Sequence, residues 1–93
     1  MVDINVTPNF KLSEFECHDS GKTPYPEEWV LSRLKILCDQ LEVIRAHFGG
    51  KIVIKSGYRT PEHNKKIGGA KNSQHVEGRA ADFSVAGVSS RIV

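Results

Sequence analysis

The sequence is poor in cysteine, which excludes a fold held together by a disulfide framework. Its 93 residues include two cysteines, Cys17 and Cys38, whereas disulfide-rich small domains carry four or more. Two buried thiols are the simplest interpretation of this pair. A single bridge between them, or metal binding by the adjacent Cys17 and His18, stays open, although no second ligand pair stands at zinc-finger spacing.

Long hydrophobic runs are also absent. No stretch approaches the about 18 consecutive apolar residues of a membrane-spanning helix. The N-terminus has neither the basic flank nor the apolar segment of a signal peptide. We therefore expect a protein that is synthesised in the cytoplasm and has no membrane partner.

The charge is almost balanced, with little excess of either sign. The 13 basic and 11 acidic side chains leave a net charge of +2, too small and too scattered to predict a nucleic acid or an anionic membrane as the main partner. The lysine-containing segment 65–71 has no aromatic side chain on which bases could stack. Hydrophobic residues at 39% and charged residues at 26% are ordinary for a globular protein, and the length allows one small domain.

The clearest element is an amphipathic helix over residues 27–48. Apolar side chains recur at steps of three and four from Val30 to Phe48, which places them on one face. Pro26 and the glutamates that follow it suit the first turn, and two glycines after Phe48 end the helix. This helix is a scaffold, and we assign no chemistry to it.

Shorter elements are expected around this helix. They are an edge strand or arm in residues 1–12, a helical turn at 13–16 with a Ser-x-x-Glu capping box, a strand at 51–55, a short helix that begins at Pro61, a loop at 68–78 and a strand at 79–85. Residues 87–93 indicate the start of a further helix, capped by Ser89 or Ser90. The predicted fold class is α+β: an antiparallel sheet packed against the long helix, with the site on the open face of the sheet.

The most unusual polar residue is Asp82, which lies inside the apolar strand 79–85. It either faces solvent on an alternating strand or is held by a cation, because a buried and unpaired carboxylate is costly. His75 precedes it by seven residues. The chain must reverse for the two side chains to meet, and Gly78 can supply the turn because glycine adopts positive φ. A histidine and an aspartate that meet in this way are suitable zinc ligands.

The order of the polar clusters resembles a known family. Ser56-Gly-Tyr-Arg59 is followed by Asn64, by two glycines and then by Ser73-x-His75-x-x-Gly78-x-Ala80-x-Asp82. This series resembles the signature of the D-alanyl-D-alanine carboxypeptidase-like zinc peptidases, the M15 peptidase family. The segment Phe10–Phe15 also resembles the N-terminal part of the short phage and bacterial members, so the resemblance covers most of the chain.

The resemblance implies a role for four residues and a fold. His75 and Asp82 would be ligands of a catalytic Zn²⁺, and Arg59 would bind the substrate and stabilise the oxyanion. Ser73 would either line the substrate site or only cap its loop. The implied fold is that of the D-Ala-D-Ala carboxypeptidase and hedgehog-like domains.

For the full-length form, the implied function is a zinc-dependent metallopeptidase that cleaves peptidoglycan stem peptides. It would act as a D,D-carboxypeptidase or as an endolysin-type endopeptidase, reaching the cell wall after release by a holin or by lysis. The alternative is a non-catalytic module of the same fold that binds cell-wall peptide or serves structurally in a phage or lysis assembly. The sequence does not indicate an oligomeric state.

One part of the family pattern is missing. The family supplies a third zinc ligand as a histidine downstream of the aspartate, with a carboxylate general base shortly before it. The eleven residues after Asp82 contain no His, Asp or Glu, and His18, His47, His63 and Cys17 do not occupy the family's position. We therefore expect residues 1–93 to form a single M15-type domain that lacks its C-terminal part, so that the chain itself would be inactive.

Overall fold

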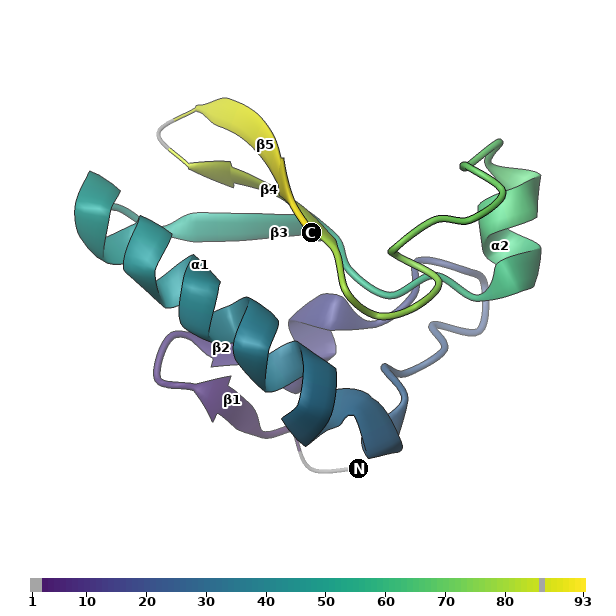
Figure 1. The fold of residues 1–93 in the computed structure, drawn as a ribbon, viewed down its shortest axis with the longest axis horizontal. Helices are drawn as coiled ribbons and strands as arrows, with labels where there is room; N and C mark the ends of the chain where they lie inside the picture. Colours follow the sequence, from purple (N-terminus) through teal and green to yellow (C-terminus); the bar gives the residue numbers. More distant parts are fainter. Residues whose placement is uncertain (1–2, 86) are drawn as a thin grey trace.

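Two antiparallel sheets and one long helix make up the computed structural model, which describes residues 3–85 and 87–93 (Figure 1). The N-terminal sheet pairs β1 (Asn5–Thr7) with β2 (Phe10–Lys11), and the second sheet has the strand order β3 (Ile52–Ser56), β4 (Ala81–Val85), β5 (Val88–Ile92). The predicted α+β class with an antiparallel sheet and a long helix is therefore confirmed.

The long helix extends over residues 27–48 as predicted, although its first turns are irregular. A 3₁₀ turn, η2 (Glu27–Trp29), leads into a π-helical turn, η3 (Val30–Leu34), and then into α1 (Lys35–Phe48). Gly49 ends α1 at φ +63°, and its N–H donates to the Arg45 carbonyl at 2.9 Å. None of the helices in the described part of the chain combines the length and apolar character needed to cross a membrane.

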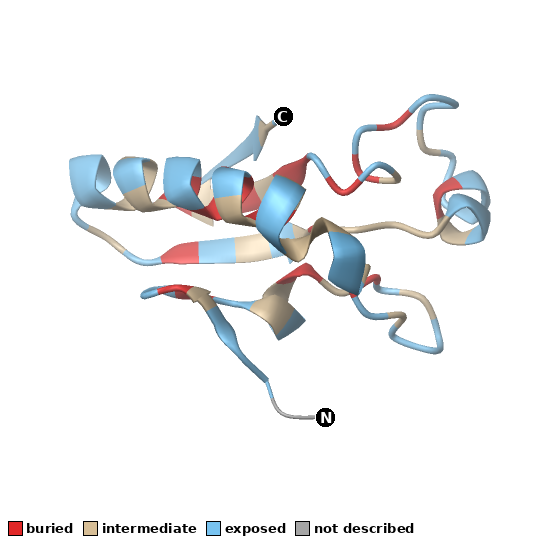
Figure 2. Ribbon diagram, turned by 60° about the horizontal axis from the view of Figure 1, so that its bottom comes forward, coloured by how far each residue is buried: buried red, intermediate tan, exposed pale blue. Residues whose placement is uncertain are grey.

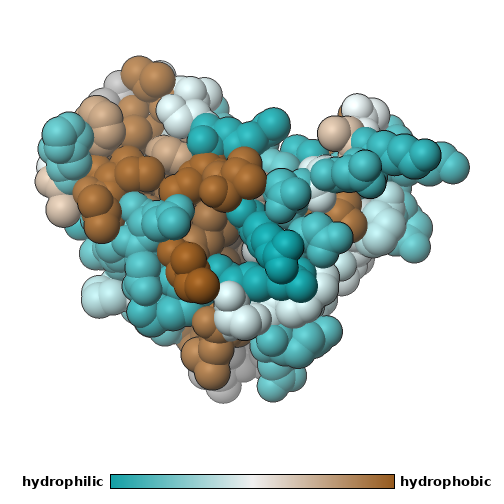
Figure 3. Space-filling model, in the orientation of Figure 1, coloured by the Kyte–Doolittle hydropathy of each residue, from teal (hydrophilic) through white to brown (hydrophobic). Residues whose placement is uncertain are grey.

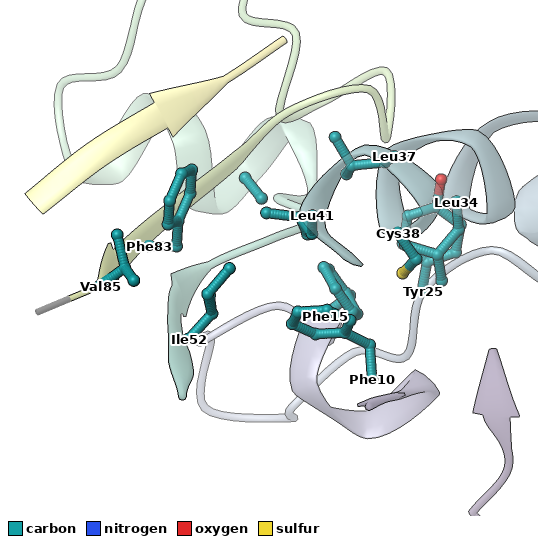
Figure 4. Close-up of a cluster of buried hydrophobic side chains, with 11 residues drawn as sticks. Phe10, Phe15, Tyr25, Leu34, Leu37, Cys38, Leu41, Ile52, Phe83 and Val85 are labelled. Atoms are coloured by element: carbon teal, nitrogen blue, oxygen red, sulfur yellow. The ribbon is translucent and has the colours of Figure 1, made fainter. Parts of the chain in front are cut away.

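The core lies between this helix and the three-stranded sheet. On β4 the buried residues alternate with half-buried ones, so one face of the strand is turned toward α1 and the other toward the outside. Figure 2 shows the buried positions of α1 along one side of the helix. Some apolar side chains of α1 are nonetheless exposed, among them Ile36 and Val43, and hydrophobic surface is visible over this part of the molecule in Figure 3. The buried side chains converge from the helix, the sheet and the N-terminal segment (Figure 4): Phe10, Phe15, Tyr25, Leu34, Leu37, Cys38, Leu41, Ile52, Ala81, Phe83 and Val85.

The N-terminal segment is hydrogen-bonded to α1. Asn9 donates from its backbone N–H and its side-chain amide to the Glu42 carboxylate, at 2.9 and 2.7 Å. The helical turn η1 (Leu12–Phe15) begins one residue before the predicted turn. The predicted capping box of Ser13 and Glu16 is wrong. Instead, the Lys11 N–H donates to Glu14 Oε1 at 2.9 Å, and Ser13 donates to the Asp3 carboxylate. This turn places the fully buried Phe15 in the core.

The predicted start of a helix at residues 87–93 is wrong, because β5 occupies this segment. Gly87 has φ +79°, and the strand then pairs with β4 from Val88 opposite Val85 to Ile92 opposite Ala81. Pairing with β4 over five residues supplies inter-strand hydrogen bonds, which outweigh the weak helix-capping preference of two serines. Serine and β-branched side chains are compatible with such an edge strand.

The remaining predicted elements are present with small shifts. The strand expected at 51–55 is β3, and the one expected at 79–85 is β4. The short helix is α2 (Pro61–Lys66), where Thr60 Oγ1 accepts from the His63 N–H at 3.1 Å as an N-cap. In the pairing of β3 with β4, Ile54 lies opposite Phe83 and Ser56 lies opposite Asp82. Two residues of β3 are therefore matched by one of β4, which is a β-bulge at the end of β3.

Both cysteines are buried free thiols. Burial raises the pKa of the Cys38 thiol to about 12. Because the thiolate is the reactive species, we expect Cys38 in the native chain to be alkylated by iodoacetamide at pH 8 at least about 100-fold more slowly than in the urea-unfolded chain. Timed alkylation followed by peptide mass spectrometry measures both rates, and equal rates in the two states would contradict the buried position of this thiol.

Candidate metal centre beside Arg59

The structure brings His75 and Asp82 together. His75 lies in the loop before β4 and Asp82 within it, and His75 Nε2 is 3.4 Å from Asp82 Oδ2. Gly78 has φ +70° in the turn between them, as the sequence predicted. The hydrogen bond from the Gly78 N–H to the His75 carbonyl, at 3.2 Å, closes this turn.

The His75 ring is fixed by the segment that follows β3. Its side chain is 3% exposed, and Nδ1 lies 2.7 Å from the Gly57 carbonyl oxygen. Because a carbonyl only accepts, Nδ1 carries the proton and Nε2 presents its lone pair. Burial lowers the pKa of His75, which favours this neutral form. The Arg59 N–H donates to the His75 carbonyl at 3.1 Å, so the backbone of residues 57–59 holds both the ring and the main chain of His75.

Asp82 lies on the outer face of the sheet and is surrounded by cationic groups. Its side chain is 24% exposed, so it is neither fully solvated nor buried. Arg91 donates from Nε to Oδ1 at 2.6 Å and from Nη2 to Oδ2 at 3.3 Å, and Arg59 Nη2 lies 3.6 Å from Oδ2. Partial burial alone would raise the pKa of Asp82, but the hydrogen bond from Arg91 and the nearby charges hold it below its usual value.

The geometry of the pair fits a zinc ion. Zinc bonds of about 2.0–2.2 Å in a tetrahedral arrangement place two ligand atoms about 3.4 Å apart, which is the separation of His75 Nε2 and Asp82 Oδ2. Nε2 is also a buried polar atom without a hydrogen-bond partner, and such atoms are rare in folded proteins. Within residues 3–85 and 87–93, however, no group of three or more His, Cys, Asp or Glu side chains could hold a metal ion. The described residues therefore supply two ligands.

Arg59 lies next to this pair, with Nη2 3.6 Å from Asp82 Oδ2. Its side chain is 13% exposed. Nη1 donates to Asn64 Oδ1 at 3.3 Å, and Nε is buried without a hydrogen-bond partner. The guanidinium is thus oriented by Asp82 and Asn64.

The contact of Asn64 with Arg59 was not predicted from the sequence, where Asn64 appeared only as a member of the polar series that resembles the family. Asn64 is buried, and its Nδ2 donates to the Ala70 carbonyl at 2.8 Å. A Cβ atom at Gly69 would collide with its side chain. The signal available in the sequence was an asparagine on a short helix that two glycines follow, since such glycines permit a close approach of backbone and side chain.

Ser73 shows the loop-capping role that the sequence left open. It is buried, and its Oγ accepts from the His75 N–H at 3.2 Å. Ser73 also lines a pocket of about 310 Å³ with Arg33, Lys71 and Arg79 among other residues, so a substrate-lining role remains a prediction.

Arg91 was not among the site residues predicted from the sequence. It lies directly opposite Asp82 in the pairing of β4 with β5, a position that only the strand interpretation of residues 87–93 could have revealed. The usable signal was the glycine at 87 between two segments that contain β-branched residues, which is typical of a hairpin.

Three aromatic rings support the turn between His75 and Asp82. Tyr25, Trp29 and Tyr58 pack edge-to-face with ring centroids 6.0–6.5 Å apart. Tyr25 Oη donates to the Gly78 carbonyl at 2.6 Å, and Arg33 lies over the Trp29 ring at 4.0 Å. The turn is therefore held from the side of the long helix as well as from residues 57–59.

Comparison with known proteins identifies a family. The family model described as Peptidase M15 matches residues 8–93. No curated protein and no solved structure matches the chain. Because the family model covers nearly the whole sequence, including all four predicted site residues, the chain belongs to the peptidase M15 family.

Proposed function

We propose that the chain belongs to a zinc-dependent peptidase that acts on peptidoglycan stem peptides, as a D,D-carboxypeptidase or an endopeptidase. Membership of the M15 family indicates a peptidase, and M15 peptidases are generally zinc-dependent. The observation that carries the proposal is the buried, unpartnered Nε2 of His75, 3.4 Å from Asp82 Oδ2. The resemblance of segments 56–59 and 73–82 to the carboxypeptidase signature supports the peptidoglycan substrate.

Each residue of the site then has a physical task. His75 and Asp82 would hold the zinc ion, which would supply Lewis-acid polarisation of the scissile carbonyl and activation of a water molecule. The Gly57 carbonyl keeps the proton on Nδ1 of His75, so that Nε2 is the ligand atom. Arg59, which lies beside Asp82, would donate to the carboxylate or the developing oxyanion of the substrate.

A second candidate is a module that binds cell-wall peptide without cleaving it. It is favoured by the number of ligands, since the described residues group no third His, Cys, Asp or Glu with His75 and Asp82. A catalytic zinc site ordinarily has three protein ligands and an open position. The two candidates share the peptide-binding role of Arg59 and differ in turnover.

Zinc titration of the purified chain tests the proposal. We expect one zinc ion per chain by calorimetry, and at least about tenfold weaker binding for His75→Ala and for Asp82→Ala, because even a residue that only orients a ligand is worth about 10–100-fold in metal affinity. His63→Ala is the matched control, since His63 lies on α2 away from the pair. Undiminished zinc binding by both ligand variants would refute the metal centre.

Turnover separates the two candidates. A zinc-loaded chain incubated with a pentapeptide that ends in D-alanyl-D-alanine releases D-alanine if it is a D,D-carboxypeptidase, and cleaves cross-linked stem peptides if it is an endopeptidase. Binding of these peptides without a new product, measured by mass spectrometry, would support the non-catalytic module instead.

A further inference from the structure

The edge of the three-stranded sheet that β5 forms is open. In the strand order β3, β4, β5, the strand β5 is bonded to β4 alone, and all of its residues except Ile92 are exposed. In an antiparallel pair, every second residue directs its backbone N–H and C=O away from the neighbouring strand. Within the part of the chain that the structure describes, β5 therefore presents peptide groups without a strand partner at this edge (Figure 1).

The opposite edge of the same sheet is protected against a further strand, whereas β5 is not. The strand β3 ends in a bulge and carries Lys55, and Lys51 directly precedes it. Bulges and lysines are two of the means by which edge strands avoid pairing with another chain. The sequence of β5 contains neither lysine nor proline, and its pairing with β4 is regular over five residues.

The single charge on β5 is already neutralised within the chain. Arg91 donates from Nε to Asp82 Oδ1 at 2.6 Å, and Asp82 lies on the neighbouring strand β4. An unpaired charge on an edge strand discourages a second strand from pairing with it. Arg91 does not have this effect, because its own sheet supplies the partner.

An apolar hollow of about 290 Å³ lies beside this edge, on the face of the sheet that α1 covers. Its lining residues are Ile44, Phe48, Phe83, Val85, Val88 and Ser90. Val88 is 61% exposed and Phe48 is 57% exposed, and hydrophobic surface gathers near the end of the β4–β5 hairpin in Figure 3. Burial of these side chains against another chain would favour association.

We propose that β5 pairs in antiparallel orientation with β5 of a second copy of this chain, with Ser90 opposite Ser90. This register places Val88 opposite Ile92 of the other copy, so that the isoleucine lies beside the apolar hollow. It places Arg91 opposite Ser89, so that the two arginines do not face each other. The pairing closes as a dimer, because the other edge of each sheet is the protected one at β3. The interface depends on neither zinc nor peptidase activity.

The register is tested by charge substitution at the centre of the pairing. Ser90 is exposed, and the two-fold symmetry makes any substitution there face its own copy. Ser90→Lys and Ser90→Glu should each self-associate about fivefold more weakly than the wild type, because like charges directly opposite each other are destabilising. A mixture of the two variants should associate about fivefold more tightly than either variant alone. Analytical ultracentrifugation over a range of chain concentrations, with EDTA present, measures these affinities.

Ser20→Lys is the matched control, because Ser20 is exposed in the loop before η2 and outside the sheet. It should self-associate as the wild type does, and thermal melting verifies that each variant is folded. A wild-type chain that stays monomeric at every concentration would overturn the proposal. Ser90 variants that associate as tightly as the wild type, or a mixture no tighter than the single variants, would do so as well. Growth beyond the dimer would contradict the protected edge at β3.

Discussion

The Gly57→Ala variant is expected to lose about 3 kcal/mol of folding free energy, the upper range for overpacking a well-packed core. A Cβ atom at this position would lie 2.7 Å from Phe15 Cα and 2.9 Å from the Phe15 carbonyl oxygen. These are backbone atoms of a fully buried residue, so they cannot move aside as a flexible side chain would. Since a chain of 93 residues has a total stability of about 5–14 kcal/mol, the loss is a large part of it.

The same substitution should also damage the metal centre. The Gly57 carbonyl holds Nδ1 of His75, and the neighbouring Tyr58 N–H donates to the Phe15 carbonyl at 2.9 Å. We therefore expect the folded fraction to bind zinc about tenfold more weakly, the size of the effect when an orienting partner is displaced. Urea denaturation measures the stability, and Gly21→Ala is the control because its Cβ would meet nothing within 4 Å. A Gly57 variant as stable as this control would contradict the close contact with Phe15.

The Gly78→Ala variant is expected to lose about 2–4 kcal/mol. One part, about 1 kcal/mol, comes from placing alanine at φ +70°. The other comes from contact, since the new Cβ would lie 2.7 Å from Tyr25 Oη and 2.9 Å from Trp29 Cε3. Tyr25 would have to withdraw from the Gly78 carbonyl. Burial raises the pKa of Tyr25 to about 12, so the phenol is protonated and the lost hydrogen bond is a neutral one.

Gly68→Ala separates the two parts. Gly68 has φ +74°, and a Cβ there would meet nothing within 4 Å. This control should lose about 1 kcal/mol from backbone strain alone, so the difference between the two variants in urea denaturation reports the contact with Tyr25 and Trp29. If both variants lose the same stability, the aromatic cluster does not support the turn.

The long helix and the pairing of His75 with Asp82 could be predicted because their determinants are local. The helix has an apolar side chain every three or four residues over 27–48 and glycines at its end. The pair requires only that the chain reverse between residues 75 and 82, and Gly78 is a residue that permits this. The recurrence of polar residues at the spacing of the M15 signature added the interpretation as ligands.

The remainder of the site depends on contacts between distant segments, which local patterns do not specify. The hydrogen bond between His75 Nδ1 and the Gly57 carbonyl joins residues 18 positions apart. Because every residue has a backbone carbonyl, the sequence does not indicate which one bonds to His75. Arg91 escaped prediction because two serines favour a helix cap locally, whereas pairing with β4 decides the structure. The contact of Asn64 with Arg59 likewise arises from the close approach of the loop at Gly69.

The bulge in β3 limits changes in the length of the segment between Ile54 and Gly57 during evolution. The extra residue between Ile54 and Ser56 shifts the pairing with β4 by one position, and the Gly57 carbonyl that meets His75 follows directly after this shift. Side chains alternate along a strand, so a change of one residue in length reverses which of them face the core. Insertion or deletion of a single residue between Ile54 and Gly57 would displace the histidine anchor while leaving its sequence motif intact. Descendants of this chain can therefore exchange side chains in this segment more readily than they can change its length.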